Sequence, residues 1–306
     1  MTIDSKPLVS VIVPAFNVDP FIGATLRSVL CQTYSHLEVL VVDDASTDAT
    51  NRIVAALALE DTRIRLFRLP QNSGRPAVPR NCGLHKSRGE LVAFLDGDDL
   101  WASRKLEEQI SVMTAQPDLV MVYSMIRNIG AVELKYDLYP LPWRAGLSRS
   151  DLERGYTLPC ATVLARRKLV EQLGGFDEDP GLKAIEDYDL WLRLTERGPL
   201  GFIPQVHALY RVHESGISRD VDAMNRRLGY LRRKRHLSQV PSVLPYPKSH
   251  FPWRVVRGIA HMMIFGGMQA LGFFERRLLR RVPLYRCGRG GRQLLLVTRT
   301  KDAAVA

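Results

Sequence analysis

The sequence predicts an α/β fold in which a mostly parallel, Rossmann-like sheet is flanked by helices and followed by a basic helical extension. Short β-branched apolar runs alternate with helical periodicity over residues 8–95, which is the pattern of βαβ units. Three runs end in polar clusters, at Pro14–Asn17, Asp43-Asp44 and Asp96–Asp99. Because the carboxyl ends of parallel strands meet at one edge of a sheet, we expect these clusters to form one ligand site.

The amino-terminal half supplies the parallel strands and their crossover helices. Strands are expected at Leu8–Pro14, Leu37–Val42, Ile64–Leu69 and Leu91–Leu95, and helices at Pro20–Tyr34, Ser46–Leu59 and Cys82–Lys86. Ser46 or Thr47 can cap the second helix. The Gly/Pro/Arg-rich segment Asn72–Asn81 is expected to be a loop.

The second half is less regular. We expect strands at Leu119–Ser124 and Ala161–Ala165, and a proline-bearing loop at Tyr136–Leu147. Helices are expected at Arg166–Leu173, which ends at two glycines, and at Glu186–Thr195.

Charge divides the chain into two parts. Residues 1–219 carry 25 basic and 28 acidic side chains, whereas residues 220–306 carry 18 basic and 4 acidic ones. We therefore expect an α/β domain over 1–219 and a basic, partly apolar helical extension over 220–306, beginning with a cationic helix at Asn225–His236. Its apolar segment Phe251–Phe274 is followed by the arginine-rich Glu275–Arg281. This pattern fits an interfacial membrane anchor, and the alternative is a helical subdomain that packs on the α/β domain or a partner copy.

Cysteine usage and hydropathy exclude several classes of protein. Cys31, Cys82, Cys160 and Cys287 form no C-x-x-C pair, which indicates free thiols in a reducing cytosol rather than a zinc knuckle or a disulfide scaffold. No signal-peptide pattern occurs at the amino terminus. The longest apolar stretch, Ile259–Phe274, is shorter than the ~20 residues that a spanning helix needs.

Two carboxylates flank a glycine directly after a predicted strand. Gly97 lets the backbone turn between Asp96 and Asp98. A carboxylate pair at this spacing can hold Mg²⁺ or Mn²⁺ that also binds a diphosphate. Acidic turns are also common as solvated loops, so this motif alone does not decide between the two interpretations.

Further motifs occur in a fixed order around this turn. They are PAFN within Val9–Asn17, DDAS within Val41–Thr50, and NSG at Asn72–Gly74 with PRN ending at Arg80-Asn81. FLDGDD within Leu91–Asp99, EDYDLWLRL at Glu186–Leu194 and YRVHESGIS at Tyr210–Ser218 complete the series. As an ordered set they resemble the family 2 glycosyltransferases, which are inverting enzymes of the GT-A fold. The resemblance covers roughly residues 7–218 and does not extend to the basic extension.

The resemblance implies a metal-dependent hexosyltransferase that uses Mn²⁺ or Mg²⁺ and a UDP- or dTDP-linked sugar donor. The residues that it places at the donor are Pro14, Ala15, Phe16, Asn17, Asp43, Arg75, Arg80, Asp96 and Arg211. Asp43 would accept a hydrogen bond from a uracil-type base. Arg80 would lie near the phosphates or brace the acidic cluster, and Arg75 lies on the same loop.

The same resemblance gives catalytic and metal-binding roles to three further side chains. Asp98 is implied as a direct metal ligand and His213 as a second one, where the alternative for His213 is an ordinary solvated or core histidine. Asp187 is implied as the general base that removes the acceptor proton. For Glu186 and Asp187 the alternative is an acidic first turn that the helix dipole favours.

The implied acceptor is a sugar, a lipid-linked glycan or a polysaccharide in cell-envelope biosynthesis. We expect a cytoplasmic protein that is peripheral on the inner face of the plasma membrane through residues 220–306. A nucleotidyltransferase is the alternative enzyme, although the chain has no evident Gly-rich signature with a following basic residue near its start. A nucleic-acid-binding protein would leave the acidic clusters unexplained, so no nucleic acid partner is expected. Asp96, Asp98 and Asp187 argue against a non-catalytic glycan-binding relative.

Overall fold

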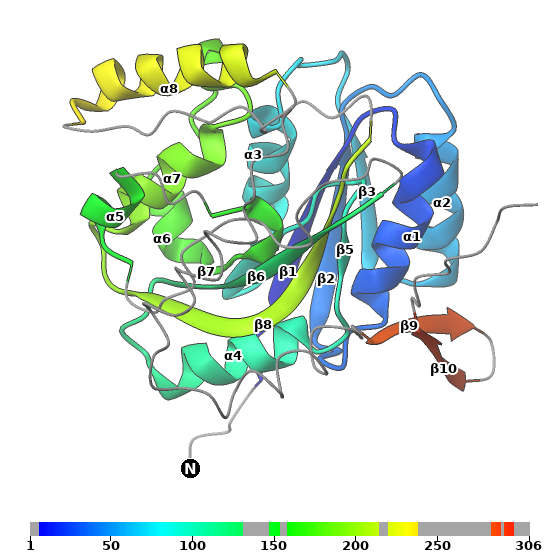
Figure 1. Cartoon of the computed structure of the whole chain (residues 1–306). Coiled ribbons are helices and arrows are strands. Elements are labelled where there is room, and N and C mark those ends of the chain that lie inside the picture. The colour runs from blue at the N-terminus through cyan, green and yellow to red at the C-terminus, as the bar shows by residue number, and fades with distance from the viewer. Residues whose placement is uncertain are drawn as a thin grey trace, which may run out of the picture.

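The computed structural model describes residues 6–130, 147–153, 158–213, 220–237, 283–288 and 291–296. One sheet of eight strands, in the order β3-β2-β1-β4-β7-β6-β8-β5, lies between helices (Figure 1). The strands of this sheet are β1 Val9–Ala15, β2 Leu37–Asp43, β3 Ile64–Arg68, β4 Leu91–Phe94, β5 Leu100–Trp101, β6 Met121–Ile129, β7 Leu164–Arg166 and β8 Leu200–Arg211. The helices are α1 Asp19–Leu30, α2 Thr50–Glu60, α3 Ala77–Lys86, α4 Lys105–Ala115, α5 Arg149–Glu153, α6 Arg167–Gln172, α7 Glu186–Leu194 and α8 Val221–Arg235, with 3₁₀ turns η1 Cys160–Thr162 and η2 Pro180–Leu182.

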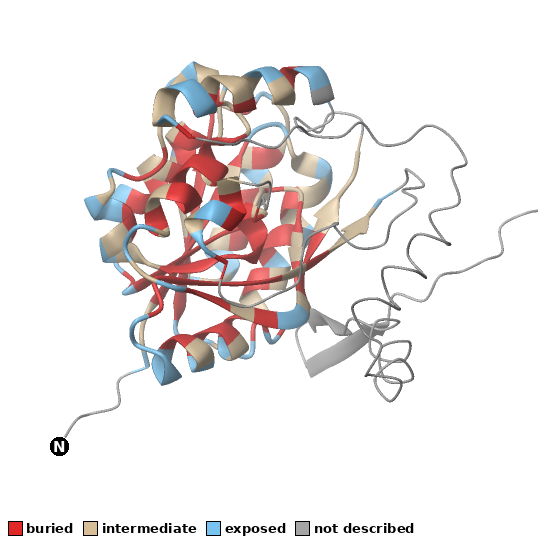
Figure 2. Cartoon of the chain, turned by 60° about the vertical axis from the view of Figure 1, so that its left-hand side comes forward, coloured by how far each residue is buried: buried red, intermediate tan, exposed pale blue. Residues whose placement is uncertain are grey.

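Strand β1 shows how helices come to cover both faces of the sheet. Its Val9, Val11 and Val13 pack into a cluster with α1, α2 and α4, whereas Ile12 packs into a second cluster with α3, α6 and α7. Successive side chains of a strand point to opposite faces, so an unbroken apolar run requires cover on both sides. Figure 2 shows the resulting buried sheet between helices whose outer faces are exposed.

The four amino-terminal strands place their carboxyl ends at one edge. β1 pairs in parallel with β2 and β4, and β2 pairs in parallel with β3. Farther along the sheet β7 is antiparallel to β4 and β6, while β6 and β8 are parallel. The predicted α/β class is therefore confirmed, and the three polar clusters lie at a common edge.

Two helix starts differ from the sequence prediction. α2 begins at Thr50 with Ala49 at its N-cap position and no side-chain cap, so the predicted cap at Ser46 or Thr47 is wrong. The Ser46 hydroxyl instead accepts a hydrogen bond from the backbone of Asn17. α3 begins at Ala77, inside the predicted loop. Pro79 is compatible with this because it lies in the first turn, where a backbone N–H has no intrahelical partner.

The elements around β8 also differ from the prediction. The expected strand Ala161–Ala165 divides into the 3₁₀ turn η1 and the short strand β7. β8 has no counterpart among the predicted strands. It contains Pro204, and its pairing with β6 changes register beside Ser124 and Met125. These irregularities remove the clean alternation by which a strand is recognised.

The basic extension is helical in part. α8 confirms the predicted cationic helix, but β9 (Pro283–Gly288) and β10 (Gly291–Leu296) form an antiparallel pair where a helical extension was expected. Glycines at the facing strand ends disfavour a helix and suit a tight hairpin. The predicted segments Phe251–Phe274 and Glu275–Arg281 lie outside the described residues, as does the loop over 136–146.

α8 packs on the α/β body. Leu228 and Leu231 are buried in the second core cluster, and Lys234 and Arg235 form ion pairs with acids of the body. For this helix the packing agrees with the subdomain alternative, while the division at residue 219 stays a prediction. Among the described residues no helix is both long and apolar enough to cross a membrane.

Candidate active site

Hydrogen bonds tie together the loops that follow β1 and β2. The backbone N–H of Asn17 donates to the Ser46 hydroxyl at 3.0 Å, and the N–H of Thr47 donates to the Asn17 side-chain oxygen at 2.9 Å. Asn17 has a φ of 50°, a conformation that asparagine tolerates and that turns the chain away from the strand. Pro14, Ala15 and Phe16 lead into this turn, and Phe16 is 44% exposed, so its ring is accessible to a flat ligand.

Asp43 and Asp44 at the end of β2 hold loops in place. Asp43 is fully buried, and its carboxylate accepts hydrogen bonds from the Ser46 backbone and the Asn51 amide. Its contact with a nucleobase stays a prediction. The Asp44 carboxylate accepts from the backbone and the hydroxyl of Ser73, which fixes the loop before α3. No local pattern in the sequence indicates this role of Asp44, because Ser73 lies 29 residues away along the chain.

The turn after β4 holds three carboxylates close together. Glycine suits position 97, since a Cβ there would crowd the Val18 side chain at 3.0 Å and the Pro14 carbonyl oxygen at 3.1 Å. The Thr25 hydroxyl donates to the carbonyl oxygens of Gly97 and Asp99, which locks the turn onto α1. Thr25 was not predicted as a site residue, because in sequence it is one more position of an amphipathic helix.

Arg80 connects this turn to the start of α7. Its two terminal nitrogens donate to Asp96 at 2.6 Å and to Glu186 at 2.5 Å, and its guanidinium lies over the Phe176 ring. Arg80 is 4% exposed. Burial opposes its charge, but the nearby acids outweigh burial and hold the pKa of Arg80 above its ordinary value. Arg80 therefore braces the acidic cluster, and its predicted position near the phosphates of the donor stays a prediction.

Asp98 meets His213 at the end of β8. The His213 Nε2 atom lies 2.8 Å from Asp98 Oδ2, and both side chains are part-exposed. Arg211 donates from its backbone to Asp99 and from Nε to the Asp98 carbonyl oxygen, each at 2.8 Å. The Phe21 ring of α1 packs against both His213 and Arg211. The two predicted metal ligands thus lie together, while the predicted donor contact of Arg211 stays a prediction.

Asp187 differs from its neighbours on α7 in having no cationic side-chain partner among the described residues. Its carboxylate accepts a hydrogen bond from the Tyr188 backbone N–H at 2.8 Å. Burial, together with the charge of Glu186, raises the pKa of Asp187 to about 7, and Arg80 offsets this only in part. A part-exposed carboxylate with this pKa is suited to accept a proton near neutral pH.

In the acidic turn, Asp96–Asp99, the nearby positive groups do not offset the burial and mutual repulsion of the carboxylates. Burial and the charge of Asp96 raise the pKa of Asp98, although His213 partly counteracts them. Burial and its two acidic neighbours raise the pKa of Asp99 as well. A divalent cation would relieve this, and a carboxylate with an imidazole is a ligand pair that Mn²⁺ accepts. In the part of the chain that the structure describes, no group of three or more such side chains is arranged around a metal position. Phosphate oxygens and water would therefore have to complete the coordination, as is usual for such ions.

Arg75 lies apart from the other predicted donor residues. It precedes α3, and its Nη1 donates to the Glu178 carbonyl oxygen at 2.6 Å. This contact directs it toward the segment before α7 rather than toward Asp98 and His213.

Comparisons with known sequences agree with this geometry. The model of the family described as Glycosyl transferase family 2 matches residues 10–174. The glycosyltransferase TuaG of Bacillus subtilis, described as acting in teichuronic acid biosynthesis, is 34% identical over 70% of this chain and 82% of its own. WfgD of Escherichia coli, a UDP-Glc:alpha-D-GlcNAc-diphosphoundecaprenol beta-1,3-glucosyltransferase, is 34% identical over 69% of this chain and 79% of its own.

Solved structures share the fold. TarS of S. aureus in complex with UDP superimposes with a TM-score of 0.60 at 20% identity, over 90% of this chain and 78% of that one. The mannosyltransferase PcManGT of Pyrobaculum calidifontis, in complex with GDP-Man and Mn²⁺, gives a TM-score of 0.58 at 21% identity, over 90% and 86%. At these identities the likeness concerns the fold alone.

Proposed function

Since the chain belongs to glycosyl transferase family 2, we propose that it is an inverting enzyme that moves a sugar from a UDP- or dTDP-linked donor to an acceptor hydroxyl. The observation that carries this proposal is the bridge through Arg80. Arg80 joins Asp96 in the acidic turn to Glu186, the neighbour of Asp187. The carboxylates that we propose to bind a cation are thereby connected to a carboxylate whose pKa suits it to accept a proton.

The donor would lie over the carboxyl ends of β1, β2 and β4. The exposed Phe16 ring supports stacking of the base, and the Asn17 turn lines the same edge. Asp98 and His213 would hold Mn²⁺ or Mg²⁺ against the diphosphate. When bound, the ion supplies positive charge where negative charge accumulates on the leaving diphosphate.

Asp187 would act as the general base. Its carboxylate accepts the proton of the acceptor hydroxyl while the acceptor oxygen forms a bond to the anomeric carbon of the donor sugar. The bond from that carbon to the diphosphate oxygen breaks, and the nucleoside diphosphate leaves with the electron pair. Attack opposite the leaving group inverts the configuration. Arg80 and Glu186 hold the start of α7, and hence Asp187, in position.

The acceptor is proposed to be a lipid-linked glycan of the cell envelope. The diphosphoundecaprenol-linked acceptor of WfgD supports the lipid link, and the description of TuaG as acting in teichuronic acid biosynthesis supports a cell-envelope glycan. α8 supports a membrane-surface position, because Arg226, Arg232 and Arg233 are exposed on it while Lys234 and Arg235 are turned inward. Basic residues near an anionic bilayer contribute about 1 kcal/mol each. The nucleotidyltransferase and nucleic-acid-binding alternatives have no support from the family to which the chain belongs.

A donor panel tests the proposed reaction. Purified protein with Mn²⁺ and a crude lipid extract should release nucleoside diphosphate from a UDP- or dTDP-sugar, and a chelator should stop the release. With an α-linked donor, NMR of the product should show a β linkage. An α linkage would overturn the inverting mechanism, and release that persists fully after metal removal would overturn the metal assignment.

Vesicle sedimentation tests the surface position separately. Full-length protein should sediment with vesicles that contain anionic lipid, and R226Q/R232Q/R233Q should remain largely in the supernatant while keeping turnover of a water-soluble acceptor analogue. Equal sedimentation of both proteins would contradict a role of the exposed α8 arginines.

A further inference from the structure

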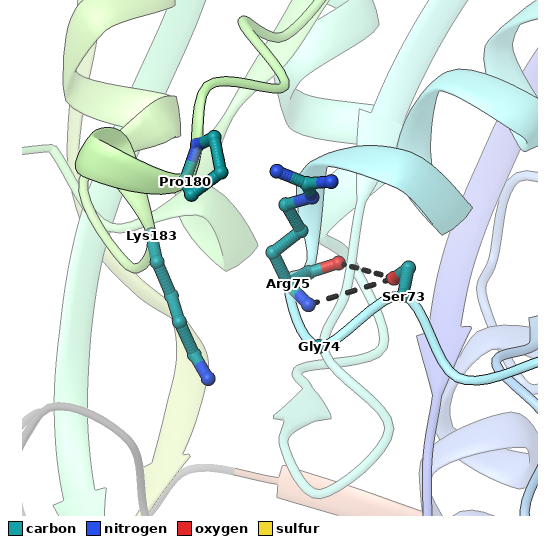
Figure 3. A pocket seen from close by; sticks show the side chains of 5 residues that line it. All are labelled: Ser73, Gly74, Arg75, Pro180 and Lys183. Carbon is teal, nitrogen blue, oxygen red and sulfur yellow. Dashed lines mark hydrogen bonds between the residues drawn. The ribbon is translucent and has the colours of Figure 1, made fainter.

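A small cavity beside the start of α7 is lined by two cations and, among the described residues that line it, by no carboxylate. Its lining is Ser73, Gly74, Arg75, Pro180 and Lys183. In Figure 3 the Arg75 and Lys183 side chains come from two segments that border this cavity, the loop before α3 and the end of η2, and their charged ends point toward opposite ends of it. The Ser73 hydroxyl bonds to the Arg75 backbone and fixes the loop that carries the guanidinium.

The guanidinium of Arg75 keeps unused donor capacity. One terminal nitrogen donates to the Glu178 carbonyl oxygen, which is neutral, and Nε is buried with no hydrogen-bond partner among the described residues. A buried donor without a partner destabilises the fold. An anion in the cavity would satisfy it and would pair with the positive charge.

The acids nearest the cavity in sequence are directed elsewhere. Asp177 and Asp179 pair with Lys234 of α8, and the Glu178 carboxylate accepts from Asn81. Lys183, on the same segment, forms no ion pair within the described part of the chain. The acids of residues 177–179 are therefore paired with other parts of the fold, while Lys183 lines the cavity without an ion pair among the described residues.

The cavity lies between the loop before α3, which Asp44 holds at the end of β2, and the segment that leads to the proposed base on α7. Lys183 is four residues before Asp187, and Glu186 between them is the partner of Arg80. From Glu186 the contacts run through Arg80 to Asp96 in the acidic turn. The proposed metal ligands Asp98 and His213 lie beyond Asp96 in this series. Because the segment of Lys183 continues directly into the helix that carries Asp187, an anion bound here is assigned to the acceptor, which approaches Asp187, and binding with the donor site filled tests this assignment against the nucleotide.

We infer that the cavity between Arg75 and Lys183 binds the diphosphate of a lipid-linked acceptor. This inference rests on the proposed function, and it replaces the donor contact expected for Arg75. It assigns acceptor recognition to two side chains outside the catalytic residues. It also explains why a cationic pair remains without acids in a region where Arg80, Lys234 and Arg235 are all paired.

A binding measurement that does not require turnover tests the inference. Undecyl diphosphate is titrated onto protein saturated with UDP and Mn²⁺, so that the donor site is filled. Loss of one charge-assisted hydrogen bond corresponds to about tenfold in affinity, so R75Q and K183Q should each weaken binding about tenfold. Undecanol should bind equally to all variants. K168Q, which removes an exposed lysine of α6, is the matched control and should bind the diphosphate like the parent protein.

Two results would overturn the inference. Either R75Q and K183Q bind undecyl diphosphate as tightly as the parent, or they weaken UDP binding by the same factor, which would return the cavity to the donor. If UDP with Mn²⁺ binds none of the proteins, the proposed function itself fails, and that result is distinguishable because it also affects the parent and K168Q.

Discussion

The acidic turn after β4 and the acidic start of α7 use their carboxylates differently. In the turn Asp96–Asp99, burial and mutual repulsion raise the pKa of two acids. At α7 the flanking acids Glu186 and Asp189 are each paired with arginine, and only Asp187 among these three lacks such a pair within the described residues. The carboxylates of the turn thus lie close together with raised pKa values, whereas the helix leaves one carboxylate without a cationic partner within the described ranges, and these are the features on which the proposed metal site and the proposed base rest.

Position on α7 gives two aspartates different surroundings. Asp187 and Asp189 are two residues apart and so point in different directions. Asp189 is fully buried between Arg193 and Arg235. Asp187 is part-exposed and has a pKa of about 7. Asp189 is therefore held in ion pairs within the fold, while Asp187 is the one that we propose as the base.

The largest effect is expected from Asp187→Asn. Removal of a general base lowers kcat by about 10³-fold, while the affinity for UDP with Mn²⁺ should stay within about twofold. Steady-state kinetics and calorimetric titration measure the two quantities. A variant that loses UDP affinity together with turnover would show that Asp187 shapes the donor site instead.

The next effect concerns the bridge between the two regions. Arg80→Met leaves Glu186 buried without its partner, which should lower the free energy of unfolding by about 3–5 kcal/mol. R80M/E186Q is the control, because it also removes the uncompensated charge and should recover part of that stability. Urea denaturation measures both variants. No recovery in the double variant would mean that Arg80 stabilises through packing on Phe176.

Asp189→Asn is the matched counterpart of the first variant. It should lower stability by about 1–3 kcal/mol, since two arginines lose a charged acceptor. The folded variant should retain turnover within about twofold. Thermal unfolding and kinetics below the melting temperature measure these effects. A 10³-fold loss of turnover without loss of stability would remove the contrast between the two aspartates.

The smallest effect concerns pH. Asp187 must be deprotonated to act as a base, and its pKa is raised to about 7, so kcat/KM should rise with pH through this value. The ionised fraction falls about fivefold from pH 7 to pH 6 for such a group. The pH dependence of kcat/KM, measured at saturating Mn²⁺, shows where its acidic limb lies. A profile flat down to pH 5 would indicate that the base has an ordinary carboxyl pKa.

Much of the site could be predicted from the chain because its motifs lie directly after strands. Apolar runs identified β1, β2 and β4, and parallel pairing then required their polar ends to meet. The pairing of Asp98 with His213 agrees with the residues chosen from the motifs. The bridge by Arg80 agrees with the predicted bracing of the acidic cluster.

Other features were set by contacts between distant segments. Residues such as Thr25 and Phe21 join the site through the packing of α1 on the acidic turn, which no local pattern reveals. The register of β8, the early start of α3 and the hairpin β9–β10 likewise depend on backbone pairing or turn geometry.

The sequence by itself determined the α/β class and the sheet edge at which the three polar clusters meet, because strand periodicity is a local property and parallel strands end at one edge. Only the tertiary structure decided which charges are paired. It separated Asp187 from Asp189 and Arg80 from Arg75, since pairing depends on which side chains approach across the fold. It also divided the basic helix α8 into inward ion pairs and outward arginines, because a helix presents different residues to the body and to solvent.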